Sequence, residues 1–388
     1  MQRRALARKT IFINAGEQSM KIKSVETTNV RIPLNDPKTF STKKIFYRDY
    51  TVFVITTESG LQGWSFSWGL PAVKTFIDQY KELLIGENAY AVEKIWDKVF
   101  RQVDRWDRSG IVMRALAGID MALWDIIGKA ANLPIYKIMG GAREEIEAYH
   151  SGGYYPQSCE GSTKAIIDYV VNEMGTAKEK GFHSFKMKIG AASPAVDLER
   201  VKQVRRAIGP DCKLMVDANC GYEPEVIIPL AKKMEEYDLT WIEEPVPLDD
   251  LRKCERVAKS TSIPIAMGEN HFGRWQFRDI IERDCASVIQ ADPTVCGGFT
   301  EYRKLSGMCS AYGLRMAPHC FHDISVQMGL AMPNVTILEY MDVAGDSINV
   351  QRIIENPVVA VNGMVRAPEG PGHGLIMDKA AVERYRLS

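Results

Sequence analysis

Three acidic residues recur at equal intervals in the second half of the chain. Asp217 ends the run KLMVD, Glu243 lies in WIEEP and Glu269 in MGEN, and each acid is 26 residues from the next. A single acid is usually a solvated loop charge, but three at equivalent strand ends would converge and repel one another. Because oxygen-only ligands select hard cations, this spacing predicts a Mg²⁺ site, with Mn²⁺ as the alternative ion. Adjacent Glu244 remains a second candidate ligand, because side-chain alternation alone does not decide which glutamate faces inward.

Two further groups could move protons beside these acids. Lys186 and Lys188 share one face of the run SFKMKIG, because side chains alternate along a strand. A lysine near another cation loses proton affinity, so Lys186 would tune Lys188 as a base near neutral pH. The alternative is that both lysines only neutralise carboxylates. His319 ends a later run and Asp292 ends the run before it, so Asp292 would hydrogen-bond the imidazole and raise its basicity.

These residues together predict a floor of metal and carboxylates with one base on each side. Such a site suits abstraction of the weakly acidic proton next to a substrate carboxylate. The enolate dianion that results needs a cation to stabilise it, and a divalent ion combined with a Lys or His base meets that need. The expected binding partner is therefore a small-molecule carboxylate.

Short apolar runs must position these residues. They begin at residues 147, 184, 213, 240, 263, 287, 315 and 336 and alternate with longer helical patterns. One strand-helix unit takes roughly 30 residues, so eight in series predict an α/β barrel whose strand ends carry the active site. An open doubly wound sheet is the alternative, but the sequence lacks the Gly-rich motif that follows the first strand of a dinucleotide-binding fold.

The chain before this series has a different pattern. Two β-rich runs from Met20 onward precede three helical patterns, which predicts a small α+β domain. We therefore expect a disordered extension over residues 1–19, the α+β domain over 20–140, the barrel over 141–345 and a tail over 346–388 that returns to the first domain. A polar loop is expected between the two β-rich runs, and its Lys43, Lys44 and Arg48 would bind an anionic substrate.

The overall composition excludes several classes of protein. Lys plus Arg and Asp plus Glu both number 49 among 388 residues, and this zero net charge disfavours a nucleic-acid or membrane-surface partner. A hydrophobic content of 46% excludes disorder as the main state, and no apolar run is long enough for a membrane helix. The eight cysteines form no Cys-x-x-Cys pair, and the basic N-terminus lacks the apolar core of a secretory signal. A cytoplasmic protein with free thiols is expected.

The motifs FKMKIG, VDAN, WIEEP, MGEN and APH occur in this order along the chain. Together with Asp292 they resemble the enolase superfamily, in its mandelate racemase subgroup. The resemblance implies an α+β capping domain on a (β/α)₇β TIM-type barrel, and it favours Glu243 over Glu244 as the metal ligand. It also implies that Glu339 assists at the substrate carboxylate, that Ser151 touches the same group, and that the chain forms a homo-oligomer, from dimer to octamer.

The resemblance leaves several reactions open, because members of this family share the first proton abstraction. The polar and basic loop favours a polyhydroxylated acid, so we expect a Mg²⁺-dependent acid-sugar dehydratase that eliminates the β-hydroxyl to give a 2-keto-3-deoxy acid. Alternatives are a racemase or epimerase, a lactone cycloisomerase, a metal-dependent barrel hydrolase and a non-catalytic binding protein on the same barrel. The hydrolase is disfavoured because the first strand carries only His150 rather than a His-x-His pair.

Overall fold

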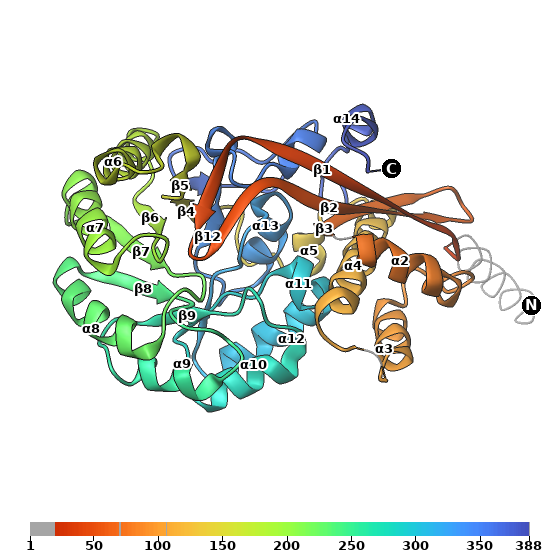
Figure 1. Ribbon diagram of the computed structural model, residues 1–388. Helices are drawn as coiled ribbons and strands as arrows, with labels where there is room; N and C mark the ends of the chain where they lie inside the picture. Colours follow the sequence, from red (N-terminus) through yellow and green to blue (C-terminus); the bar gives the residue numbers. More distant parts are fainter. Residues whose placement is uncertain (1–19, 70, 106, 388) are drawn as a thin grey trace, which may run out of the picture.

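The computed structural model describes residues 20–69, 71–105 and 107–387. A mainly antiparallel sheet with its helices forms a cap, and a series of parallel strands and helices forms a barrel beside it (Figure 1). This is the fold class that the sequence predicts. The extension expected at residues 1–19 lies outside the described residues.

The cap places one long helix between its sheet and the barrel. Gly118 of this helix lies against Phe53, where a Cβ atom would come within 2.2 Å of the ring, so the close approach requires glycine. The helix also contacts two helices of the barrel, α11 (Pro293–Cys296) and α12 (Gly298–Ala311). The cap consists of β1 (Ile22–Phe40), β2 (Lys43–Thr57), β3 (Gln62–Trp68), α2 (Pro71–Tyr80), η1 (Lys81–Leu83), α3 (Val92–Gln102), α4 (Gly110–Ala131), which is the long helix, and α5 (Ile135–Ile138).

The polar segment that the sequence predicts as a loop is instead the outer half of a long β-hairpin. Strands β1 and β2 pair as far as Phe40 opposite Lys43, with a register shift between Pro33 and Lys38. The end of β1 also pairs with the short strand β5 (Tyr155–Pro156), which follows the first barrel strand. This tertiary pairing overrides the low strand propensity of the prolines and charges in the segment. Figure 1 shows the hairpin reaching from the cap to the barrel.

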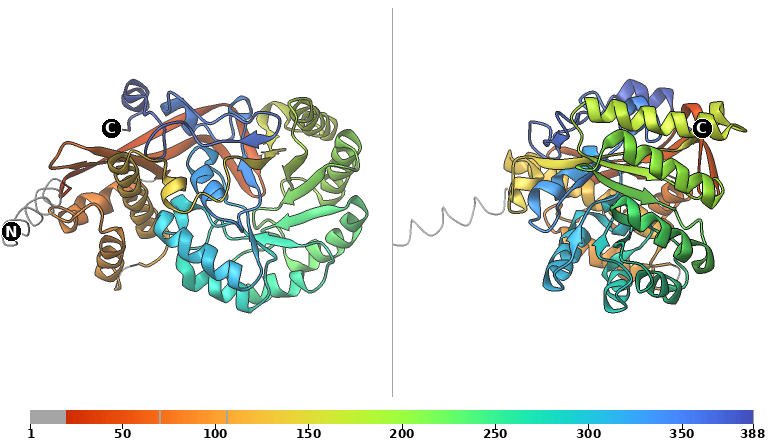
Figure 2. Two further views of the ribbon diagram at one scale, coloured as in Figure 1. Left: turned by 180° about the vertical axis from the view of Figure 1, so that it is seen from behind. Right: turned by 90° about the vertical axis from the view of Figure 1, so that its left-hand side faces the viewer.

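The barrel contains eight strands in the order that the sequence predicts. Each neighbouring pair in the order β11-β10-β9-β8-β7-β6-β4-β12 is parallel, and helices surround the strands (Figure 2). The strands are β4 (Ile146–Gly152), β6 (Ser184–Lys188), β7 (Lys213–Asp217), β8 (Leu239–Glu243), β9 (Ile265–Met267), β10 (Val288–Ile289), β11 (Arg315–Met316) and β12 (Leu338–Tyr340). The remaining helices are α6 (Thr163–Glu179), α7 (Pro194–Ile208), α8 (Pro224–Met234), α9 (Leu251–Ala258), α10 (Gly273–Glu282) and α13 (His322–Ala331), with 3-10 turns η2 (Gln157–Cys159) and η3 (Glu235–Tyr237).

A separate apolar cluster fills the inside of the barrel. It contains one residue from each of β4, β7, β8, β9 and β10 and one residue next to each of β11 and β12. Residues two positions further along a strand point to the same side. The side chains after Met215 and Trp241 in this alternation are Asp217 and Glu243, so the barrel interior directs both acids to the carboxyl end. The cluster consists of Tyr149, Met215, Trp241, Ala266, Val288, Ala317 and Ile337.

The C-terminal segment contacts both parts of the molecule. It contains η4 (Val343–Gly345), η5 (Val350–Ile353), β13 (Met364–Val365), which pairs with β4, and α14 (Lys379–Arg384). At its end, the amide of Leu387 donates to the carbonyl of Asn29 in the cap. Within the described residues, no helix has the length and apolar character needed to cross a membrane. The eight cysteines are free thiols.

Candidate active site

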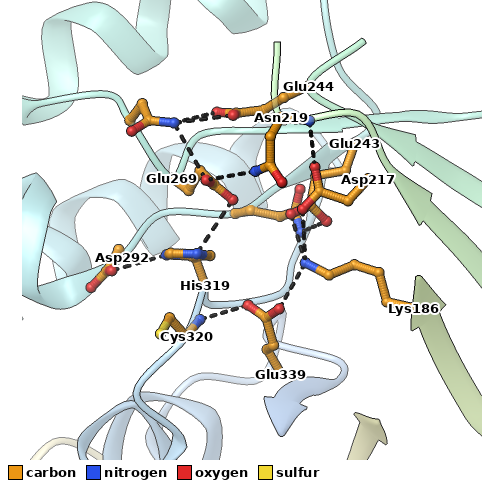
Figure 3. A network of polar contacts seen from close by, with 12 residues as sticks. Lys186, Asp217, Asn219, Glu243, Glu244, Glu269, Asp292, His319, Cys320 and Glu339 are labelled. Carbon is orange, nitrogen blue, oxygen red and sulfur yellow. Dashed lines mark hydrogen bonds and ion pairs between the residues drawn. The ribbon is translucent and has the colours of Figure 1, made fainter. Parts of the chain in front are cut away.

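Three carboxylates meet at the carboxyl ends of neighbouring barrel strands. Asp217 ends β7, Glu243 ends β8, and Glu269 follows β9 directly after Gly268. One carboxylate oxygen from each lies within 4.8 Å of the others, and all three side chains are buried. Figure 3 shows the three side chains approaching one another. The predicted convergence is therefore confirmed.

The chemistry of this donor set fits a hard divalent cation. Burial, followed by the charge of Asp217, raises the pKa of Glu243 well above its ordinary value. Oε2 of Glu269 is buried and makes no hydrogen bond to any described residue, although Nε2 of His319 lies at ion-pair distance, 3.3 Å away. This oxygen therefore retains capacity for a ligand. Buried anions that crowd together in this way are stabilised by a cation, and oxygen-only ligands suit Mg²⁺ or Mn²⁺.

Lys186 is fully buried among carboxylates. Its Nζ lies 2.6 Å from Oε1 of Glu243, 2.7 Å from Oε1 of Glu339 and 3.7 Å from Oδ2 of Asp217. Burial opposes ionisation, but these charges outweigh it and raise the pKa of Lys186 well above its ordinary value. Lys186 is therefore a permanent cation that balances part of the acidic cluster.

Lys188 lies on the same face of β6 and contacts a different part of the cluster. Its Nζ forms an ion pair with Oδ2 of Asp217, and it lies 5.4 Å from the centre of the Tyr154 ring. Burial is the largest influence on the pKa of Lys188 and lowers it, yet Asp217 raises it above the ordinary value. The lowering by Lys186 that the sequence predicts is present, but the charge of Asp217 outweighs it.

His319 and Asp292 form the predicted pair. Nδ1 of His319 lies 3.0 Å from Oδ2 of Asp292, which turns Nε2 toward Oε2 of Glu269, 3.3 Å away. Asp292 is itself held at the N-terminus of α11, where its Oδ1 accepts from the amide and hydroxyl of Thr294 at 2.7 and 2.8 Å. Burial opposes protonation of the imidazole, but Glu269 and Asp292 raise the pKa of His319 to about 10.

Glu339 connects β12 to the same network. Its Oε2 accepts from the backbone amide of Cys320 at 2.7 Å, while its Oε1 contacts Lys186 (Figure 3). Burial alone would raise the pKa of Glu339, but Lys186 holds it well below its ordinary value. Glu339 is therefore an ionised carboxylate with both oxygens engaged.

Two residues that sequence reasoning missed hold Glu243 in place. Nε2 of Gln290 donates to Oε2 of Glu243 at 2.5 Å, and Nε1 of Trp241 donates to the same oxygen at 3.2 Å. These bonds leave Oε1 toward Lys186. Strand alternation is the signal that could have found both residues, because Trp241 precedes Glu243, and Gln290 precedes Asp292, by two positions.

Glu244 turns its carboxylate toward the cavity edge instead of the metal centre. Its backbone has a left-handed φ of 38°, which breaks the strand alternation directly after Glu243. Nδ2 of Asn270 donates to both of its oxygens at 3.0 and 3.1 Å, and also reaches Oε1 of Glu269 at 3.4 Å. Burial, followed by the charge of Glu269, raises the pKa of Glu244 to about 8. Glu244 therefore supports Glu269 through an amide.

A cavity of about 370 Å³ adjoins these groups. Lys188, Glu269 and His319 line it from the barrel, and Lys43 and Arg48 line it from the hairpin of the cap. The hairpin, β3 and the cap helix α4 contribute further side chains to its wall: Phe40, Ile45, Trp68 and Arg114. The cap therefore completes a pocket whose floor is the acidic cluster.

Two predicted substrate-binding residues are not among the described residues that line the cavity. Nζ of Lys44 instead pairs with Oε2 of Glu160 at 3.1 Å on the protein surface. Ser151 is buried on the inward face of β4, two positions after Tyr149, and its hydroxyl has no hydrogen-bond partner among the described residues. Strand alternation explains why Lys44 does not line the cavity, because Lys43 and Lys44 point to opposite faces of β2.

Two family models match most of the chain. Residues 22–140 match the model of the N-terminal domain of mandelate racemase / muconate lactonizing enzyme, and residues 170–381 match that of enolase C-terminal domain-like proteins. The chain therefore belongs to the enolase superfamily, in the subgroup of mandelate racemase and muconate lactonizing enzyme.

Individual relatives differ in the reaction they catalyse. An arabinonate dehydratase of Saccharolobus solfataricus is 31% identical over 343 residues, which is 86% of this chain and 89% of that protein. A D-galactarolactone cycloisomerase of Agrobacterium fabrum is 30% identical over 382 residues, 95% of this chain and 99% of that protein. The crystal structure of a Streptomyces coelicolor racemase with bound magnesium has a TM-score of 0.87 at 27% identity, and the match covers 94% of this chain and all of that one. Family membership therefore leaves the reaction open.

Proposed function

We propose that the protein is a Mg²⁺-dependent acid-sugar dehydratase. The enzyme breaks the C2–H bond of the substrate and the C3–O bond of its β-hydroxyl, releases water, and forms an enol that becomes a 2-keto-3-deoxy acid. The observation that carries this proposal is that Lys188 and His319 line one cavity beside three converging carboxylates. Elimination needs one group that removes a proton and another that delivers one, and these two side chains meet that need.

Each residue of the network has a role in this proposal. Lys188 removes the proton from C2 in its neutral form, which a cation held by Asp217 would favour by competing with the ammonium for that carboxylate. His319 delivers a proton to the departing hydroxyl. Asp292 orients the imidazole through the 3.0 Å contact to Nδ1. Lys186 and Glu339 form a fixed charged pair, with Nζ and Oε1 2.7 Å apart, next to the position of the substrate carboxylate.

The metal is assigned to Asp217, Glu243 and Glu269. A divalent cation at these three carboxylates would stabilise the negative charge that develops on the substrate carboxylate. The bound magnesium in the Streptomyces coelicolor structure supports this choice of ion. Magnesium also agrees with the hard oxygen donors, and manganese remains the alternative.

The substrate class is argued from the cations that the cap contributes to the cavity wall. Lys43 and Arg48 supply cationic donors, which favour a polyhydroxylated acid over an aromatic one. The similarity to an arabinonate dehydratase supports an acid sugar. Lys44 has no role in this proposal, because its ammonium pairs with Glu160 outside the cavity.

A substrate panel tests the proposal. The purified protein is incubated with Mg²⁺ and a series of aldonic and aldaric acids, and 2-keto products are detected with semicarbazide. At least one acid is expected to give a 2-keto-3-deoxy product, and removal of the metal with EDTA is expected to stop its formation. Turnover of an aromatic 2-hydroxy acid in a panel that gives no keto product would contradict the proposal.

A racemase, epimerase or lactone cycloisomerase is the second candidate. The similarity to the D-galactarolactone cycloisomerase favours it, because the match covers 99% of that relative's length. Reaction in D₂O separates the two candidates. A racemase or epimerase exchanges the α-proton for deuterium, and a lactone cycloisomerase opens the ring, but neither reaction releases water. The dehydratase instead gives a product whose new C3 position carries deuterium.

A further inference from the structure

Arg114 extends from the cap helix α4 to the cavity. It is the one charged residue in an otherwise apolar stretch over residues 111–119. Contacts of α4 with α11 bring this part of the helix beside the strand ends, and Arg114 lines the cavity together with Val295 and His319. The guanidinium lies 5.8 Å from the centre of the Phe272 ring. Arg114 therefore belongs to the cavity wall although it comes from the other part of the molecule.

Within the described residues, no acid forms an ion pair with Arg114, although Asp292 and Glu269 act on its charge from further away. Its Nη1 atom is buried and has no hydrogen-bond partner among the described residues. Burial lowers the pKa of Arg114, and the charges of Asp292 and Glu269 only partly offset this effect. Arg114 as a whole is half-buried, and a cation that is partly removed from water is normally paired, because an unpaired one is costly. An arginine of this kind in a cavity wall indicates a binding partner that is supplied from outside the chain.

Two more cations of the cavity wall have free capacity. Arg48 uses its Nε to donate to the carbonyl of Ser347 at 2.8 Å, which leaves its terminal nitrogens available. Lys43 lines the same cavity, and within the described residues neither side chain forms an ion pair. Lys188 differs from these cations, because Asp217 balances its charge. The wall contributed by the cap therefore carries a positive charge that one substrate carboxylate, bound at the acidic floor, would not neutralise.

We propose that Arg114 is a specificity-determining residue that binds the second carboxylate of a dicarboxylic acid sugar. The inference rests on the proposed function for the identity of the first, reacting carboxylate, and it narrows the substrate class from acid sugars in general to aldaric acids. The planar guanidinium can hold a carboxylate through two parallel hydrogen bonds. The free Nη1 is one of the donors that such a pair needs.

Binding to a non-reacting protein tests this inference without depending on turnover. In the Lys188→Ala, His319→Ala background with saturating Mg²⁺, calorimetry compares aldarates with aldonates of the same configuration, such as galactarate with galactonate and glucarate with gluconate. The aldarate of at least one pair is expected to bind ten times more tightly or better. Arg114→Gln is expected to remove that preference by weakening aldarate binding at least tenfold while changing aldonate binding less than threefold, and Arg114→Lys to restore part of it.

Several outcomes would overturn the inference. Equal affinity for both acids of every pair, an aldarate preference that survives Arg114→Gln, or tighter binding of 6-phosphogluconate than of any aldarate would each do so. Arg114→Gln must keep the Tm of the parent within a few degrees, and Arg114→Met serves as a second neutral variant. Failure of the proposed function is distinguished by the product assay on the unmodified enzyme, because it asks whether water is lost and the binding assay does not.

Discussion

The side-chain amide of Gln290 donates to Oε2 of Glu243 at 2.5 Å and thereby fixes the other oxygen, Oε1, toward the centre of the acidic cluster. Gln290 lies on the loop after β10 and does not line the cavity, so it acts on the cluster only through Glu243. Residues that orient a metal ligand commonly change metal affinity by 10- to 100-fold when they are removed.

Gln290→Leu is therefore expected to weaken Mg²⁺ binding by about 10- to 100-fold. The substitution leaves Oε2 of Glu243 with the single bond from Trp241, so the carboxylate can rotate. Isothermal titration with MgCl₂ measures the effect. Gln327→Leu is the matched control, because Gln327 is equally buried but contacts Tyr136 and His373 away from the site. Equal loss of affinity in both variants would mean that Gln290 only supports the fold.

Loss of the base should be separable from loss of the metal. Lys188→Ala is expected to reduce kcat by at least about 10²-fold, because a positioned base contributes that much to proton transfer. Its Mg²⁺ affinity should remain within a few-fold of the parent, since Lys188 contacts a metal ligand without being one. Asp217→Asn should instead weaken Mg²⁺ binding strongly. If Lys188→Ala lost the metal to the same extent, the assignment of Lys188 as a base would be wrong.

The contact between His319 and Asp292 predicts that kcat falls by different amounts in two variants. Asp292→Asn removes the negative partner of Nδ1, and kcat is expected to fall by about 10²- to 10⁴-fold with little change in KM. Thr294→Val removes only the 2.8 Å hydroxyl bond to Asp292, so a loss of a few-fold is expected. Steady-state kinetics on the best substrate of the panel gives both values. A larger loss in Thr294→Val than in Asp292→Asn would contradict the proposed role of Asp292.

Asp120 predicts a pH dependence of stability that is separate from catalysis. It lies on α4 where the cap meets α12, and its Oδ2 accepts from the amide of Thr300 at 2.9 Å. Burial raises the pKa of Asp120 to about 7 although the bonds from Thr300 lower it. The folded state therefore binds more protons at this site than the unfolded state between about pH 4 and pH 7, and stability contributed here falls as pH rises.

Asp120→Asn should abolish that fall, because the amide carries no charge at any of these pH values. The difference in unfolding free energy between Asp120→Asn and the parent is expected to grow in favour of the variant from pH 5 to pH 7 and to level off above it. Urea titrations at pH 5, 6, 7 and 8 measure the difference. A difference that stays constant across this range would show that Asp120 is ionised throughout.

Strand spacing predicted the barrel because local pattern and tertiary structure agree there. The runs expected to begin at residues 184 and 213 begin at these positions as β6 and β7. The polar hairpin was missed because its outer half depends on pairing with β5, more than 100 residues later in the chain. Local propensity carries no information about such a partner.

The acidic cluster was predictable because, as for the barrel, the local sequence pattern and the tertiary structure agree. Asp217, Glu243 and Glu269 follow strands of one sheet, so their convergence follows from the parallel register. Arg114 was missed because only the packing of α4 against the barrel brings it to the cavity. Its isolation within an apolar helix face was the signal in the sequence, because a charge there requires a specific partner.

Anomalous scattering from crystals grown with Mn²⁺ tests the central claim most directly. One strong peak is expected among Asp217, Glu243 and Glu269, close enough for each carboxylate to supply an oxygen ligand. The same crystals would show Lys188 and His319 next to the open side of that ion. A peak elsewhere, or an ion held by fewer than two of these acids, would contradict the assignment of the metal site and with it the proposed chemistry.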